Sequence, residues 1–155
     1  MEKADVKLNI LIDILYDKIQ NLNLILNICI NQETILLSQE KNIEILNFFK
    51  ETAKEKQNSI DKILMLDSSF NSTYDQVSDV FKDRNLSLAY KPSIVKIQNL
   101  ISQIEDLTEK IKNFEKSNDT LIAKIKPYKK SPTKQSYTRL QNLYNNKKRN
   151  MEEFR

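Results

Sequence analysis

Histidine, the side chain most often used for proton transfer near neutral pH, does not occur in this sequence. A catalytic acid or base would therefore have to be a carboxylate, a lysine or a cysteine with a strongly shifted pKa. Carboxylates occur in pairs at helical spacing, at Glu33 with Glu40 and at Asp75 with Asp79. Both pairs lie among polar residues, which is typical of a solvated helix face. They therefore predict a solvent-facing surface and not a catalytic dyad.

Cys29 is the only cysteine, so no disulfide can form within the chain, and without histidine the usual zinc ligand sets are missing. We interpret Cys29 as a small apolar residue on a helix; a reactive thiol is the alternative. The chain also contains no glycine. Walker loops, dinucleotide fingerprints, nucleophile elbows and EF-hand loops all need glycine. We therefore expect a protein that is not an enzyme, with no catalytic residues, no cofactor and no metal.

The elements that would carry any binding site are predicted to be helices. Absence of glycine disfavours hairpins and most sheets, and the abundance of Ile, Leu, Lys, Asn and Glu with only three prolines favours long helices. The chain begins with charged residues and shows no cleavage-like site, so we expect no signal peptide. Polar residues interrupt the most apolar region, residues 8–30, which argues against a membrane-spanning helix. These features predict a soluble protein in the reducing cytoplasm.

Three long helices are predicted, with approximate bounds 5–38, 39–83 and 93–126, because apolar residues recur there in steps of three and four. We expect residues 1–126 to form one all-α domain, an elongated antiparallel bundle or coiled coil. Residues 84–93 contain proline and several turn-forming residues and are interpreted as a connection.

The second predicted helix has a weak point between residues 50 and 59, where Ala53 is the only apolar residue. This thinning indicates either a bend or a well-solvated stretch of a long helix. Further along, residues 67–69 could act as a local cap, although we favour a helix that continues through them. In the stretch KEKQNSIDKILMLDSSF, residues 54–70, we expect the apolar side chains Ile60, Ile63 and Phe70 to face the first helix. The same expectation leaves Lys56, Asp61 and Asp67 solvated.

The third predicted helix has the most regular pattern in the chain. Steps of three and four alternate without error, which is typical of a left-handed supercoiled seam. A single polar residue, Asn118, interrupts the apolar series; it either fixes register or is tolerated because the seam ends near solvent. The members of the seam are Ile97, Leu100, Ile104, Leu107, Ile111, Phe114, Asn118, Leu121 and Ile125.

The C-terminal part, residues 127–155, is predicted to be a basic linker followed by a short amphipathic helix. Residues 124–155 carry ten basic and two acidic side chains, a net charge of +8; the whole chain carries +4, so residues 1–123 carry −4. The predicted helix carries one narrow stripe of aromatic and apolar residues, at Tyr137, Leu140, Tyr144 and Met151. So short a helix is marginal in water, so we expect it to be mobile alone and ordered by a partner. Because the rest of the chain is acidic and contains no recognisable reading module, we expect no nucleic-acid partner.

Two stretches of the chain resemble a known family. LIDILYDKIQNLNLILNICINQETIL is followed by ILNFFKETAKEKQNSIDKILMLDSSFNSTYDQV, which is similar to the second helix of FlgN-type flagellar export chaperones. The third predicted helix, IQNLISQIEDLTEKIKNFEKSNDTLI, resembles the third helix of that family through Asn118, Leu121 and Ile122. Ser68 and Ser69 depart from the family pattern, which often has Arg or Glu there. The matching positions of the second helix are Lys56, Ile60, Asp61, Ile63, Leu66, Asp67, Phe70 and Tyr74.

The resemblance implies a cytoplasmic type III export chaperone. Such a protein would bind terminal helical segments of hook-associated, or hook-filament junction, flagellar proteins, prevent their premature association and deliver them to the export gate. It would contact the gate component through Tyr128. The residues expected to bind cargo are Leu107, Ile111, Phe114, Asn118, Leu121, Ile122, Ile125, Tyr137, Leu140 and Tyr144.

A second hypothesis from the same residues is a structural coiled-coil adaptor or homodimer without an export role. The regular seam between Ile97 and Ile125 motivates it, because such a seam can pair with a second copy of the chain. Neither hypothesis includes stable insertion into a membrane.

Overall fold

The computed structural model describes residues 2–38 and 43–124, and it is helical almost throughout those ranges. The element order is α1 (Glu2–Leu37), α2 (Ile43–Lys82), α3 (Arg84–Ala89) and α4 (Lys91–Ala123), with no strand among the described residues. The prediction of an all-α protein is therefore confirmed. The predicted linker and C-terminal helix, residues 127–155, lie outside the described residues.

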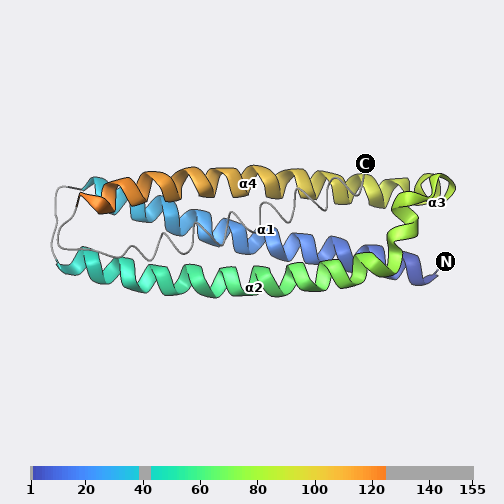
Figure 1. Ribbon diagram of the computed structural model, residues 1–155, viewed down its shortest axis with the longest axis horizontal. Helices are drawn as coiled ribbons and strands as arrows, with labels where there is room; N and C mark the ends of the chain where they lie inside the picture. The colour runs from blue at the N-terminus through green and yellow to red at the C-terminus, as the bar shows by residue number, and fades with distance from the viewer. Residues whose placement is uncertain (1, 39–42, 125–155) are drawn as a thin grey trace.

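The three long helices lie side by side in a rod (Figure 1). At a rise of 1.5 Å per residue, their lengths are about 50 to 60 Å. Side chains joining Tyr16 to Lys96 and Cys29 to Glu115 show that α1 and α4 run parallel to each other. Lys18 meets Asp67 and Gln32 meets Thr52, so α2 runs antiparallel to α1. The backbone of α1 packs along both neighbours, whereas the backbones of α2 and α4 approach each other at few points.

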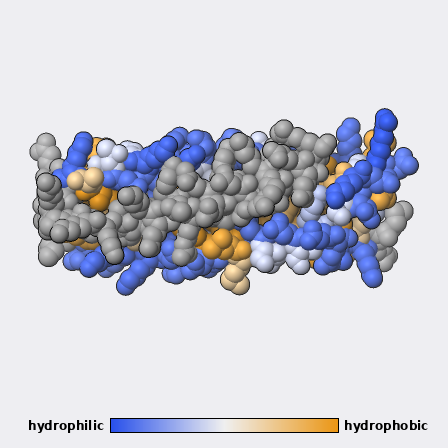
Figure 2. All heavy atoms as spheres, viewed as in Figure 1, coloured by the Kyte–Doolittle hydropathy of each residue, from blue (hydrophilic) through white to orange (hydrophobic). Residues whose placement is uncertain are grey.

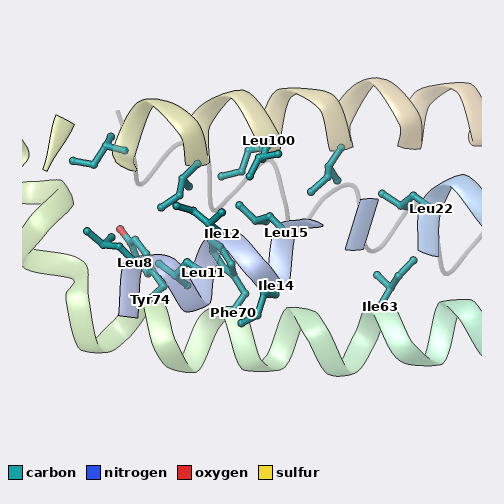
Figure 3. Packing of buried hydrophobic residues seen from close by; sticks show 14 of the residues in the cluster. Leu8, Leu11, Ile12, Ile14, Leu15, Leu22, Ile63, Phe70, Tyr74 and Leu100 are labelled. Atoms are coloured by element: carbon teal, nitrogen blue, oxygen red, sulfur yellow. The ribbon is translucent and has the colours of Figure 1, made fainter. Parts of the chain in front are cut away.

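A continuous apolar core forms where the inner faces of the three helices meet (Figure 3). Leu8, Leu11 and Leu15 of α1 lie between α2, which contributes Phe70 and Tyr74, and α4. The buried residues of α1 follow the steps of three and four that keep one face on a neighbouring helix. Two apolar residues of α1, Ile10 and Ile30, are exposed.

Residues 84–93, interpreted from the sequence as a connection, contain a short helix, α3, and the first residues of α4. Asp83 has an extended backbone, and its carboxylate accepts hydrogen bonds from the backbone N–H groups of Asn85 and Leu86, which starts α3. Tyr90 ends α3 and directly precedes α4. Pro92 lies in the first turn of α4, where a missing N–H costs no hydrogen bond. The chain thus reverses direction through one short helix.

α2 continues through residues 67–69, as favoured from the sequence, and it contains no bend between residues 50 and 59. Its backbone leaves the helical region once, at Val77, which produces a kink near the end of the helix. No described helix combines the length and the apolarity that crossing a membrane requires.

Candidate functional site

Six polar side chains from all three long helices meet inside the rod, at a level where the apolar core is interrupted. We call this set the polar layer: Cys29 and Gln32 of α1, Thr52 and Lys56 of α2, and Glu115 and Asn118 of α4. All six residues are buried. Each continues the three- and four-residue steps of the apolar stripe on its own helix, so the fold places them inside by register.

An ion pair lies at the centre of the polar layer. Lys56 Nζ is 2.7 Å from Glu115 Oε1, and both side chains are 0% exposed. Burial of two charges costs several kcal/mol for each ion, so the pair is stable only if further hydrogen bonds complete it. Lys56 Nζ also donates a hydrogen bond to Gln32 Oε1 at 3.0 Å. The ammonium group therefore links α2 to both of its neighbours.

Hydrogen bonds extend the ion pair into a network. Cys29 Sγ donates to the same Glu115 Oε1 at 2.9 Å, and Gln32 Nε2 donates to Thr52 Oγ1 at 2.8 Å. Asn118 Nδ2 donates to the backbone carbonyl of Cys29 at 3.0 Å. Thr52 Oγ1 in turn donates to a backbone carbonyl of its own helix, that of Phe48 at 2.9 Å. The network thus fixes the relative positions of three helices.

Two oxygen atoms of the polar layer are left without a hydrogen bond within the described part of the chain. They are Glu115 Oε2 and Asn118 Oδ1. Burial raises the pKa of the Glu115 carboxyl, against the opposing effect of the Lys56 ammonium group. Burial, together with the nearby Glu115 carboxylate, also raises the pKa of the Cys29 thiol. A raised thiol pKa keeps Cys29 in its unreactive, protonated form.

Lys56 corrects a sequence-based expectation, because it is fully buried and not solvated. Its whole side chain is enclosed, and its charge is offset by Glu115. The stretch between residues 50 and 59 is consequently neither bent nor well solvated; Thr52, Lys56 and Ser59 continue the buried stripe with polar side chains. Asp61 is exposed, as expected. Asp67 is only partly exposed and pairs with Lys18.

Asn118 was expected to be buried or to lie near solvent, and its 0% exposure excludes the second alternative. Glu115 was missed because it is charged and falls one residue after the predicted seam position Phe114. The actual buried stripe of α4 includes Ile101, Thr108, Glu115 and Ile122 in addition to five seam residues, Ile97, Leu100, Ile104, Ile111 and Asn118.

The residues expected to bind cargo lie against the rest of the bundle wherever they are described. Ile111, Asn118 and Ile122 are buried, and Leu107, Phe114 and Leu121 are partly buried against apolar neighbours. Ile125, Tyr128, Tyr137, Leu140 and Tyr144 lie outside the described residues. Among the expected carboxylate pairs, Asp75 and Asp79 are exposed. Within residues 2–38 and 43–124, no cluster of three or more His, Cys, Asp and Glu side chains could hold a metal ion.

The outer surface carries a groove between α1 and α2. Its volume is about 340 Å³, and it is lined by Asp17, Gln20 and Asn21 of α1 and by Lys62, Met65, Leu66 and Ser69 of α2. Met65 is 72% exposed, and its neighbour Leu64 is exposed as well. In the same view as Figure 1, Figure 2 shows mostly hydrophilic side chains on the described surface, with an apolar patch at the lower edge over α2.

Comparison with protein-family models, with curated proteins and with solved structures finds no match for the chain.

Proposed function

We propose that this protein binds amphipathic helical segments of partner proteins, as a chaperone does. The observation that supports the proposal most directly is the groove between α1 and α2, where apolar side chains are exposed to solvent beside polar ones. When a partner covers a large exposed apolar side chain such as Met65, the free energy falls because apolar surface is removed from water. Methionine also adapts its shape to different partners, because its side chain is unbranched and polarizable.

The lining of the groove suits one kind of occupant. An amphipathic helix would place its apolar side on Met65 and Leu66 and its polar flanks beside Asp17 and Lys62, one acidic and one basic residue. The helix would then extend the rod by one more member, packed as the existing helices are packed. This mode of binding leaves the buried core of the bundle unchanged.

Within this class, the partner that the sequence favours is a terminal helical segment of a hook-filament junction protein, bound before export and handed to the export gate. The support is the resemblance of the second helix to FlgN-type chaperones. Five matching residues, Lys56, Ile60, Ile63, Phe70 and Tyr74, are buried in the bundle, so the resemblance concerns the residues that build the scaffold. The partner-binding role of Leu107, Phe114 and Leu121 would require them to leave the apolar clusters against which they pack.

The test is size-exclusion chromatography with light scattering on the full chain, alone and mixed with purified hook-filament junction proteins. We expect one of them to form a complex of defined mass. Met65→Asp should weaken that complex at least tenfold, since it places a charge on the apolar contact. Val95→Asp is the matched control, because Val95 is also an exposed apolar residue but lies on α4. Equal binding by both variants would contradict the proposed groove, and failure of every junction protein to bind would contradict the export role.

The coiled-coil adaptor hypothesis predicts a different result in the same experiment. A dimer of the free chain whose mass does not change on dilution, with no complex in any mixture, would favour it. The described bundle already covers seam residues Ile97, Ile104 and Ile111 with α1, so a single chain satisfies the seam that motivated this hypothesis.

A further inference from the structure

The polar layer divides the apolar core into two separate clusters. The main apolar cluster contains twenty buried residues, from Leu8 of α1 to Ile111 of α4. Within residues 2–38 and 43–124, the small apolar cluster contains four buried residues, Leu36, Ile45, Phe49 and Ile122, with Ile35, Phe48 and Leu121 packed against them. Cys29 belongs both to the main cluster and to the polar layer; the other five residues of the layer fall between the residues of the two clusters on their helices.

The two clusters hold their parts of the rod with unequal strength. Free energy of local opening grows with the apolar area that the segment buries, so a cluster of four residues resists opening far less than one of twenty. The small cluster comprises the last turns of α1 and α4 and the first turns of α2. These turns also lie at helix ends, where some backbone groups lack partners within the helix.

The polar layer is a favourable place for such an opening to stop. Glu115 Oε2 and Asn118 Oδ1 have no hydrogen-bond partner in the described part of the chain, and a buried polar atom without a partner is costly. Water that enters from the opened end can hydrogen-bond these two atoms and solvate the ion pair. Opening beyond the layer would expose the main apolar cluster to water, and no newly hydrated polar group would offset that cost.

Lys56 and Glu115 also form the direct link between α2 and α4 at this level. The backbones of these helices approach each other at few points, and the 2.7 Å contact is made by two long side chains. We propose that the polar layer is a break point: residues 33–37, 44–51 and 119–123 open together as one unit while the main apolar cluster stays packed. This inference does not depend on the proposed function.

Native-state hydrogen exchange of the full chain, measured residue by residue at low denaturant concentrations, tests the break point. Backbone amides of the small cluster should exchange about 100-fold faster than those of the main cluster and should share one opening rate. Along each helix, the exchange rate should change abruptly at the polar layer. The opposite end of the rod, near α3, has no such layer among its described residues and serves as the internal control. A gradual rise in rate toward both ends would indicate ordinary fraying and would overturn the proposal.

Two matched double variants distinguish an effect of the polar layer from the general effect of removing an ion pair. Lys56→Met with Glu115→Leu replaces the central pair by apolar side chains and joins the two clusters, so the 100-fold step should shrink to less than about tenfold. Lys18→Met with Asp67→Leu removes a second ion pair, which lies beside the main cluster, and should leave the step unchanged. Equal effects of both double variants, or no effect of the first, would overturn the break point. Circular dichroism checks that each variant is folded, and the wild-type step stands as a test by itself.

Discussion

Two of the ion pairs that join described residues of the long helices differ in depth. Lys18 and Asp67 join α1 to α2 at 2.5 Å with side chains 5% and 19% exposed. Lys56 and Glu115 join α2 to α4 at 2.7 Å with both side chains fully enclosed. Each pair leaves one carboxylate oxygen enclosed without a hydrogen bond among the described residues, Asp67 Oδ2 and Glu115 Oε2. The difference therefore lies in access to water and in the neighbouring groups.

Both pairs join a lysine ammonium to a carboxylate, but the two carboxylates differ in their exposure to solvent. The Asp67 side chain is 19% exposed, so its charge depends less on further hydrogen bonds than a fully enclosed charge does. Glu115 has no such contact, and its charge depends on Lys56 and on the Cys29 thiol, both of which donate to Oε1. Removal of one partner should consequently matter much more at the inner pair than at the outer pair.

Glu115→Ala should give the largest effect. It leaves the Lys56 ammonium buried without a counter-charge, and loss of one partner of a buried pair typically lowers the free energy of unfolding by about 3 to 5 kcal/mol. Urea unfolding followed by circular dichroism measures the change. A loss below about 1 kcal/mol would show that the two pairs are equivalent despite their depths.

The double variant Lys56→Met with Glu115→Leu should reverse that loss. Apolar side chains of similar volume remove both desolvation costs, so the free energy of unfolding should equal the wild-type value or exceed it by about 1 to 4 kcal/mol. The same urea titration, with both single variants, completes a double-mutant cycle. Additive losses from the two single changes would contradict a coupled pair.

Alkaline pH should weaken the fold through Cys29. Its pKa is raised in the folded state, so above the ordinary thiol value of about 8.5 the unfolded chain loses its thiol proton first and unfolding becomes easier. Stability from this group is complete below that pH and falls by up to about 1.4 kcal/mol for each unit above it. Cys29→Ser keeps a donor toward Glu115 but does not titrate there. Urea unfolding at pH 8 to 10 should show a shallower decline for the serine variant; parallel declines would exclude a contribution from the thiol.

Asp67→Asn should give the smallest change of the set. The amide can still accept a hydrogen bond from Lys18, and the charge that it removes is partly exposed, so we expect a loss of about 1 kcal/mol. This loss, measured under the same conditions, is the reference for Glu115→Ala. A loss as large as that of Glu115→Ala would remove the distinction between inner and outer pairs.

The helical class and the approximate helix bounds could be predicted from the sequence because they depend on local properties. Absence of glycine and the spacing of Ile and Leu were enough to place three long helices within a few residues of their ends. The start of α4 at Lys91 was missed because Pro92 was interpreted as a breaker, whereas a first-turn proline favours a helix start.

The polar layer was largely missed because only apolar residues were followed along each helix. Thr52 and Lys56 continue the stripe of α2, but their burial depends on partners that lie far away in the sequence, such as Glu115. A usable signal existed: polar residues occupy matching three- and four-residue steps on all three helices. Asn118 was recognised as a polar member of its seam, since it was flanked by apolar residues on the expected face.

The central place of α1 has a consequence for the order of folding during synthesis. α1 and α2 are neighbours in the chain and can pair as a hairpin as soon as both have left the ribosome. The contacts of α1 with α4 span a much longer loop, 86 residues between Cys29 and Glu115, and contacts of such separation form late. The face of α1 that packs against α4 is therefore exposed to solvent on the nascent chain until α4 has been synthesised. For the same time, Lys56 has no Glu115 carboxylate with which to pair.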